Sequence, residues 1–253
     1  NSFVPCNGRF PTLIAIITMF FVGTGGGPGR ALLSALLLTG VIVLGVLLTF
    51  QVSRLLSATV LKGVPSSFTL ELPPYRRPRV GQVIVRSVLD RTLFVLGRAV
   101  MIAAPAGLLI WVLANVQVGS VSILAHCTGF LDPLGQALGM DGVILAAFIL
   151  GFPANEIVIP IMLMAYLATG SLTGYESLDA LRTLLTNQGW TWLTAVCTML
   201  FSLVHWPCST TCMTIRKESG SWKWTLLGFA LPTAIGMALC FLVATIARLL
   251  GLA

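Results

Sequence analysis

The chain has 253 residues, of which 57% are hydrophobic and only 9% are charged, and its mean hydropathy is +0.96. Soluble domains carry about 25% charged residues, so this composition excludes a soluble globular protein and indicates an integral membrane protein. The formal net charge of +7 does not indicate nucleic-acid binding, because the basic residues gather at the ends of apolar runs, where they meet lipid head groups.

Apolar runs near the roughly 20 residues that a bilayer crossing needs predict the spans. They are 11–22, which is short, 31–52, 99–116, 190–215 and 224–250, together with an interrupted run at 141–169. The sequence therefore predicts an all-α fold, a polytopic helical membrane protein with about five to six spans. Residues 117–140 are only weakly apolar and are predicted to form a connection.

Between the second and third runs, the stretch 54–98 is rich in Arg, Lys and Pro, so we expect a basic loop. Its second half, 82–98, mixes apolar residues with Arg86 and Asp90, which are four positions apart. That pattern predicts an amphipathic helix. The helix lies either in the membrane interface or in solvent on the cytoplasmic side.

The distribution of charge predicts the orientation. The loop 54–98 and the short turn 216–223 are both basic, so the positive-inside rule places both on the cytoplasmic side. A single crossing by 141–169 would put the second turn outside, whereas two half-helices that enter and return on one face keep both inside. We expect this re-entrant hairpin. The alternative is one broken span, with a further crossing hidden in 117–140.

The interrupted run 141–169 carries Asn155 and Glu156 at its middle, between two prolines. Proline removes backbone hydrogen bonds, and irregular backbone at membrane depth is tolerated only where protein or a wet cavity surrounds it. A carboxylate at this depth indicates a cation or proton site. The ordinary alternative is an interfacial or paired carboxylate, with Arg9 as a candidate partner.

Two proline-cysteine motifs lie far apart in the chain, with their thiols at Cys6 and Cys208. Each thiol stands where proline begins or interrupts a helix. If Pro207 begins a helix, Cys208 lies near its positive dipole end, which favours the thiolate, the form that binds metal. If the second motif is helical, His205, Cys208 and Cys212 share an arc of about 60°. Core packing is the ordinary alternative for such residues.

Other chemistry is poorly supported. The glycine-rich stretch 23–30 lacks the Lys-Ser/Thr pair of a phosphate loop, and no carboxylate lies close in sequence to His205. The sequence therefore predicts that the chain is not an enzyme. Its six cysteines are scattered through mostly apolar sequence, so we expect free thiols.

Three stretches, SFVPCNGRFPT, GFPANEIVIPIMLMAYL and HWPCSTTCMTIRKESGSWKW, resemble the membrane half of the ferrous iron transport protein B (FeoB) family. The resemblance covers nearly the whole chain in the right order. It implies Fe²⁺ uptake across the cytoplasmic (inner) membrane of a bacterium or archaeon, as the permease part of a GTPase-gated system. It divides the chain into 1–53, the end of a first Gate-like region and the following span; 54–98, the basic cytoplasmic loop with its interfacial helix; and 99–253, a second Gate-like region with the C-terminal spans.

By motif, Cys6 and Cys208 match the family's two proline-cysteine thiols. Asn155 and Glu156 match its polar turn after Gly-Phe, where many members have Lys-Glu instead. Fe²⁺ accepts thiolate, carboxylate and amide ligands, so the resemblance implies a metal site made of these four residues. The residues expected around it, along the pathway, are His205, Ser209, Cys212, Gly151 and Pro153.

The resemblance also implies partners. Family members carry an N-terminal GTPase domain and further spans, so GTP would act only through a domain absent here, and the chain is expected to be a fragment or a processed piece. Expected partners are membrane lipid, that N-terminal portion, a small Feo A-type protein and further copies of the chain, with no nucleic acid. Two rival functions stay open: a proton-coupled carrier of small organic solutes, and a nontransporting structural or signalling module.

Overall fold

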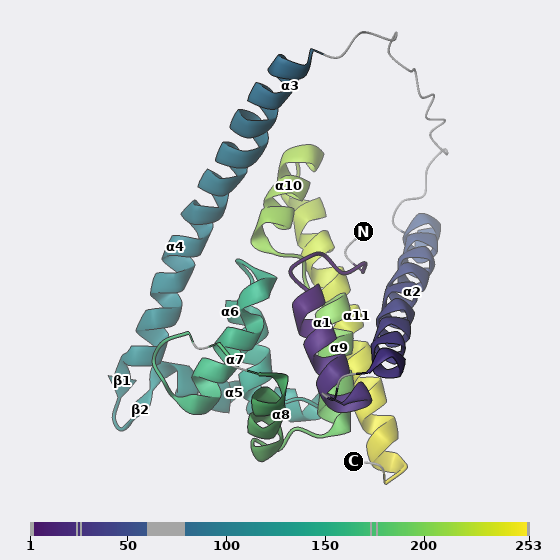
Figure 1. Ribbon diagram of the computed structural model, residues 1–253, viewed down its shortest axis with the longest axis vertical. Coiled ribbons are helices and arrows are strands. Elements are labelled where there is room, and N and C mark those ends of the chain that lie inside the picture. Colours follow the sequence, from purple (N-terminus) through teal and green to yellow (C-terminus); the bar gives the residue numbers. More distant parts are fainter. Residues whose placement is uncertain are drawn as a thin grey trace.

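The computed structural model describes residues 3–59 and 79–251, apart from positions 24, 26, 173 and 176 (Figure 1). About 79% of the chain is helical, and the two strands in the described part have two residues each. Helices satisfy their backbone hydrogen bonds internally, which a segment inside a bilayer must do. The predicted all-α membrane fold is confirmed.

In chain order the helices are α1 (Phe10–Ile17), α2 (Pro28–Thr59), α3 (Val80–Arg86), α4 (Phe94–Asn115), α5 (Ile123–Ala137), α6 (Gly142–Leu150), α7 (Val158–Leu167), α8 (Leu178–Asn187), α9 (Trp192–Val204), α10 (Ser209–Ser219) and α11 (Trp222–Leu249). Three shorter segments with other helical windings are Thr18–Val22, Ser87–Leu93 and Asn155–Ile157. The strands β1 (Gln117–Val118) and β2 (Val121–Ser122) form an antiparallel pair.

Among the described residues, three helical stretches are long and apolar enough to cross a membrane: α2, the interrupted stretch from α9 to α10, and α11. A fourth candidate is the pair of α5 and α6, whose axes bend by 111°. Shorter apolar helices accompany them, including α1 and α7, and α4 is an apolar helix of 22 residues over the predicted span 99–116. By length and composition, the described residues thus contain three or four candidate spans together with these further apolar helices.

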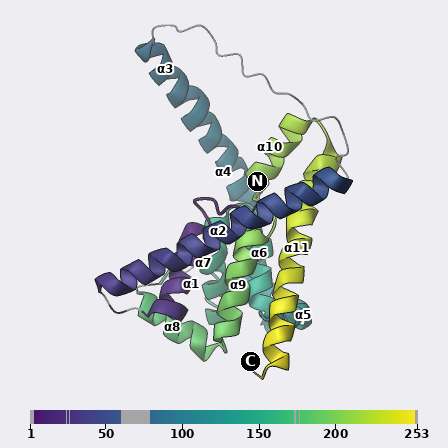
Figure 2. The same ribbon diagram turned by 90° about the vertical axis from the view of Figure 1, so that its right-hand side faces the viewer.

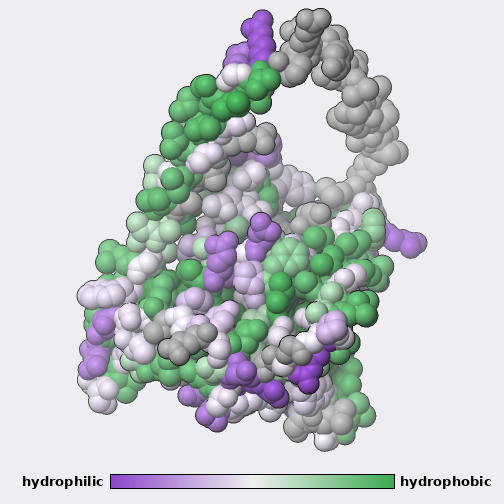
Figure 3. Space-filling model, viewed as in Figure 1, coloured by the Kyte–Doolittle hydropathy of each residue, from purple (hydrophilic) through white to green (hydrophobic). Residues whose placement is uncertain are grey.

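The predicted amphipathic helix at 82–98 is helical, but it does not end before the predicted span at 99–116. α3, the segment Ser87–Leu93 and α4 follow one another without a break as a single rod that projects from the rest of the molecule (Figure 1). Apolar side chains cover much of this rod (Figure 3). α2 continues to Thr59, past the predicted start of the loop at residue 54, and residues 60–78 lie outside the described part.

The interrupted run at 141–169 folds back on itself as a hairpin of α6 and α7. Asp141 caps α6 by accepting a hydrogen bond from the Ile144 N–H at 2.7 Å, and it also accepts one from the hydroxyl of Tyr166 near the end of α7. The two ends of the run therefore meet. Helices of 9 and 10 residues are roughly 14 and 15 Å long, about half of the hydrocarbon core. This is the geometry expected of the re-entrant alternative.

Protein surrounds this hairpin. In α7, six of the ten side chains are buried, and its apolar residues face neighbours all round, which is the pattern of a fully buried helix. Phe148 of α6 packs edge-on against Phe201 of α9, with ring centroids 5.0 Å apart. The irregular backbone between α6 and α7 is thus held inside the protein, as the physics of the bilayer requires.

The long helix α2 crosses over the bundle at a steep angle (Figure 2). Val52 of α2 belongs to a small buried cluster with Phe3, Leu203 and Val204. Gly45 lets the helix approach the N-terminal segment, because a Cβ atom there would collide with the carbonyl oxygen of Phe3. The start of the N-terminal segment is thereby packed against α2 at Phe3.

Candidate functional site

Two breaks in the helices meet inside the protein. One is the turn 151–154 at the tip of the α6–α7 hairpin, and the other is the segment 205–208 between α9 and α10. The Ser209 N–H donates to the carbonyl oxygen of Phe152 at 3.0 Å, and the Ser209 hydroxyl donates to that of Pro153 at 3.3 Å. The first N–H groups of a helix have no partner within it, so α10 uses one of its own to hold the hairpin tip.

The N-terminal segment is fixed to the second break by Arg9, which is only 3% exposed. Its guanidinium donates to the carbonyl oxygens of Leu203 at 2.8 Å, His205 at 3.1 Å and Trp206 at 2.9 Å. The last carbonyl groups of a helix lack intrahelical partners, and a cation at this end also interacts favourably with the helix dipole. Arg9 therefore caps α9 and holds the segment that carries Cys6 against it.

The three pieces enclose a cavity of about 290 Å³. Both proline-cysteine motifs reach it, because Cys6 and Cys208 line it together with Asn155, Arg9 and Thr211. The thiols are free, with Cys6 exposed and Cys208 half-buried. Residues about 200 positions apart thus contribute to one cavity, and three of the four predicted metal ligands belong to it.

Cys208 occupies the N-cap position of α10. Its sulfur lies 3.1 Å from the Thr210 hydroxyl oxygen and 3.2 Å from that of Thr211. Hydroxyl groups that donate to sulfur, together with the positive end of the helix dipole, favour negative charge on this atom. The residue pattern alone predicts no specific role for these two threonines.

His205, Cys208 and Cys212 do not share one helical face, because the chain is extended at His205, where α9 ends. The side chain of His205 lies in the core, whereas Cys208 faces the cavity. The Cys212 sulfur approaches the carbonyl oxygen of Pro207 at 3.7 Å. The predicted shared face required one continuous helix through residues 205–212. The helix is interrupted because Pro207 has no N–H group to donate to a backbone carbonyl of the preceding turn.

Asn155 connects the core to the cavity. Its side-chain amide is 7% exposed, with Oδ1 3.4 Å from Nε2 of His205 and Nδ2 3.9 Å from the sulfur of Cys6. The other ring nitrogen of His205, Nδ1, lies 2.9 Å from the carbonyl oxygen of Phe201 and 3.0 Å from that of Ser202. A chain of polar contacts thus runs from the end of α9 through His205 and Asn155 to Cys6.

Glu156 lies apart from this cavity. Its side chain is exposed and covers Gly8, where a Cβ atom would be 3.1 Å from both Cγ and Oε1 of the glutamate. Gly8 is two positions from Cys6, so the carboxylate is close to the N-terminal segment but does not line the cavity. The structure brings Asn155 to the thiols and leaves its neighbour at the surface.

Gly151 and Pro153 shape the hairpin tip. A Cβ atom at Gly151 would lie 2.6 Å from Cγ2 of Val158 and 2.9 Å from the carbonyl oxygen of Ala147, so a side chain does not fit there. The Pro153 carbonyl accepts the Ser209 hydroxyl. Neither residue lines the cavity, and both belong to the turn that leads into Asn155.

Within the described part of the chain, no three His, Cys, Asp or Glu side chains are grouped closely enough to hold a metal ion by themselves. The cavity instead offers two sulfur atoms and one amide. Such an incomplete set, with room for carbonyl or water ligands, suits an ion that must enter and leave rather than one held permanently.

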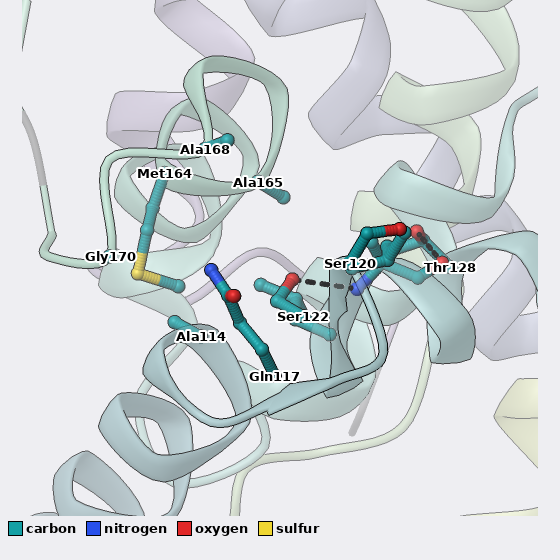
Figure 4. A pocket seen from close by; sticks show the side chains of 12 residues that line it. Ala114, Gln117, Ser120, Ser122, Thr128, Met164, Ala165, Ala168 and Gly170 are labelled. Atoms are coloured by element: carbon teal, nitrogen blue, oxygen red, sulfur yellow. Dashed lines mark hydrogen bonds between the residues drawn. The ribbon is translucent and has the colours of Figure 1, made fainter.

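A second cavity, of about 250 Å³, lies where the β1–β2 turn covers the space between α5 and the end of α7 (Figure 4). Its polar lining includes Gln117, Ser120, Ser122 and Thr128 (Figure 4). The Ser122 hydroxyl oxygen accepts a hydrogen bond from the Ala125 N–H at 3.2 Å. None of the residues predicted for the metal site or pathway lines this cavity.

Comparison with known families gives two matches in succession. Residues 38–90 match the family described as "Ferrous iron transport protein B C terminus", and residues 96–222 match the Gate family, described as "Nucleoside recognition". The first match covers the end of α2 and the beginning of the α3–α4 rod. The second covers the hairpin and the break before α10.

Curated relatives agree with these matches. The Fe(2+) transporter FeoB of Staphylococcus aureus (strain COL) is 29% identical over 95% of this chain, and that of Methanocaldococcus jannaschii is 27% identical over 99%. A Porphyromonas gingivalis protein, a fusion of Fe(2+) transport protein A and Fe(2+) transporter FeoB, is 23% identical over 94% of the chain.

The chain spans only about a third of the length of these relatives: 34%, 36% and 32%. No solved structure matches it. The Gate match covers residues 96–222, which is 127 of the 253 residues and just over half. The chain therefore belongs to the Gate family, and its residues 38–90 match the C-terminal region of ferrous iron transport protein B.

Proposed function

We propose that the chain forms part of an Fe²⁺ transport path and that the cavity between Cys6 and Cys208 is a binding station on that path. The supporting observation is that both proline-cysteine motifs line one cavity of about 290 Å³ together with Asn155. The relatives named as Fe(2+) transporters support the choice of ion. Fe²⁺ enters this proposal as the transported substrate.

The chemistry of the donors fits this ion. Fe²⁺ is intermediate in softness and accepts both thiolate and oxygen ligands, whereas Mg²⁺ and Ca²⁺ bind through oxygen. Arg9 places a fixed positive charge on the cavity wall, so an ion is retained there only when negative sulfur faces it. Two thiolates, one amide oxygen and water give a site that binds and also releases.

The remaining predicted residues take supporting roles in this proposal. Glu156, which is exposed near Gly8, attracts cations to the rim of the cavity through its negative charge. Ser209, Gly151 and Pro153 hold the hairpin tip against α10. His205 orients Asn155, and Cys212 packs behind the site at the Pro207 carbonyl.

We further propose that this permease portion works with parts that the chain does not contain. The relatives are about three times as long, which is consistent with a GTPase portion that gates transport. The fusion protein from Porphyromonas gingivalis, by its printed name, supports a small Feo A-type partner. The two basic segments, 54–98 and 216–223, support a multi-pass arrangement in the cytoplasmic membrane with both segments on the cytoplasmic side.

The test is ⁵⁵Fe²⁺ uptake by cells that carry the complete transporter with Cys6→Ser or Cys208→Ser in this portion. Serine keeps the size of the side chain but removes the thiolate, so uptake is expected to fall at least tenfold. Cys127→Ser is the matched control, because this cysteine is exposed and lies away from the cavity. Unchanged uptake in both site variants, at equal protein level, would remove the thiol-ligand proposal.

A further inference from the structure

The hydrogen bonds of His205 fix which of its nitrogens carries a hydrogen. Nδ1 lies between two carbonyl oxygens, at 2.9 Å from that of Phe201 and 3.0 Å from that of Ser202. A carbonyl oxygen only accepts hydrogen bonds, so a bare lone pair on Nδ1 would face two further lone pairs. Nδ1 therefore carries the N–H and donates to the end of α9.

The surroundings of the ring favour its neutral form. The His205 side chain is 1% exposed and packs against three aromatic rings, those of Phe148, Phe201 and Trp206. The guanidinium of Arg9 already donates to the His205 carbonyl oxygen. A second proton on the ring would bury another cation beside this one, which is costly without a counter-charge. A neutral ring with N–H at Nδ1 presents a lone pair at Nε2.

Of the two ends of the Asn155 side-chain amide, only the NH₂ nitrogen can donate a hydrogen bond to the lone pair on Nε2. The side-chain amide is nearly symmetric in shape, so its hydrogen-bond partners decide which end is oxygen. We propose that His205 is a positioning residue, which binds the Asn155 NH₂ group at Nε2 and so turns the amide oxygen toward Cys6 and the cavity. The inference rests on the Nδ1 contacts and on the 3.4 Å separation between Nε2 and the amide. It exchanges the amide oxygen and nitrogen relative to the orientation described above, in which Oδ1 faces Nε2 and Nδ2 faces Cys6.

This orientation determines what the cavity can bind. An amide oxygen beside two sulfur atoms gives a mixed oxygen and sulfur donor set, whereas an NH₂ group there would repel a cation. A mixed set favours an ion of intermediate softness over a strongly thiophilic one such as Cd²⁺. This consequence rests on the proposed function, but the orientation itself does not, and it is measurable without metal.

The first experiment is ¹⁵N NMR of the chain in lipid nanodiscs with labelled histidine. The chain has only two histidines, so His126→Gln leaves His205 as the single reporter. We expect one protonated nitrogen, Nδ1, and one unprotonated nitrogen, Nε2, with an Asn155 NH₂ hydrogen coupled to Nε2. Protonation of both nitrogens, or of Nε2 alone, would overturn the proposal.

The second experiment compares Fe²⁺ and Cd²⁺ affinity in the same preparation. Asn155→Leu removes the oxygen, so Fe²⁺ affinity is expected to fall about tenfold and Cd²⁺ affinity less than about threefold. His205→Phe, which keeps an aromatic ring in the core, frees the amide and is expected to shift the two metals in the same unequal way. Equal losses for both metals would contradict a specificity role for the amide.

The two experiments separate this inference from the proposed function. If the parent chain binds no Fe²⁺ in the cavity while the NMR result holds, the transport proposal fails and the amide orientation stands. If Fe²⁺ binds through both thiols but Nε2 is protonated, the proposed amide orientation fails and the transport proposal stands.

Discussion

The guanidinium of Arg9 donates to the carbonyl oxygen of Leu203 at 2.8 Å, although 194 positions separate the two residues in the chain. Two further bonds, to His205 and Trp206, complete the same contact. A planar group with five N–H donors suits three carbonyl oxygens that converge at the end of a helix, which a lysine ammonium does not match as well. The contact brings the first proline-cysteine motif to the second.

Arg9→Met should therefore destabilise the chain. It keeps the length of the side chain but leaves three carbonyl groups of the α9 terminus unpaired, at an expected cost of about 3 kcal/mol in the free energy of unfolding. Arg9→Lys should recover only part of this loss. Thermal unfolding in lipid nanodiscs measures both, with the exposed Arg182→Gln as control. A loss of stability no larger than in that control would show that the Arg9 hydrogen bonds do not hold the N-terminal segment against α9.

Gly151→Ala should disturb the hairpin tip. The added methyl group collides with Val158 and with the Ala147 carbonyl oxygen, and overpacking of this kind costs about 1–3 kcal/mol. Gly40→Ala is the matched control, because nothing lies within 4 Å of its added Cβ and alanine favours the α2 helix by up to about 1 kcal/mol. Unfolding measurements should show opposite signs for the two. A stabilising effect at both positions would mean that the hairpin tip has room for a side chain at residue 151.

Tyr166→Phe should weaken the base of the hairpin. The hydroxyl donates to Asp141 and accepts from the indole N–H of Trp190 at 2.9 Å, so its removal leaves both groups without this partner, at a cost of about 1–3 kcal/mol. Faster amide hydrogen exchange is expected in α6 and α7. Tyr175→Phe, at an exposed position, should change neither quantity. Amide exchange at the same rate as in the parent chain would show that the Tyr166 hydroxyl does not hold the two ends of the hairpin together.

Glu156→Gln should act on ion capture more than on the binding station. Loss of one exposed negative charge near the rim is expected to raise the KM for Fe²⁺ uptake about two- to fivefold while the maximal rate changes little. The effect should shrink at high salt, since exposed charges are screened. Glu218→Gln, on the exposed end of α10, is the control. A collapse of the maximal rate would instead place Glu156 among the ligands.

Much of the fold was predictable because the bilayer restricts it. Long apolar runs, the basic turns and the proline-flanked Asn155 indicated helical spans and a hairpin. Helix ends were harder to predict: α2 continues past Arg54 to Thr59, and the α3–α4 rod shows no boundary where composition changes. A composition change marks a change of environment, and a helix can continue through it.

The site was predictable in its residue types and less so in its geometry. Proline next to cysteine indicated helix breaks, and Cys6, Cys208 and Asn155 do line one cavity. Glu156 follows Asn155 directly, yet in the short helical turn that begins there only the first side chain is directed to the cavity. For Arg9 the sequence predicts only a candidate pairing with Glu156. Its role depends on carbonyl groups released about 200 positions later, which no local pattern shows.

In the proposed path, one Fe²⁺ ion binds between the two proline-cysteine motifs. Anomalous diffraction at the iron edge, from crystals of the chain soaked anaerobically with Fe²⁺, locates that ion. We expect an iron peak in the cavity within bonding distance of the sulfur atoms of Cys6 and Cys208, and loss of that peak in the double serine variant. An iron peak elsewhere in the parent crystal, with the cavity between these sulfurs empty, would contradict it.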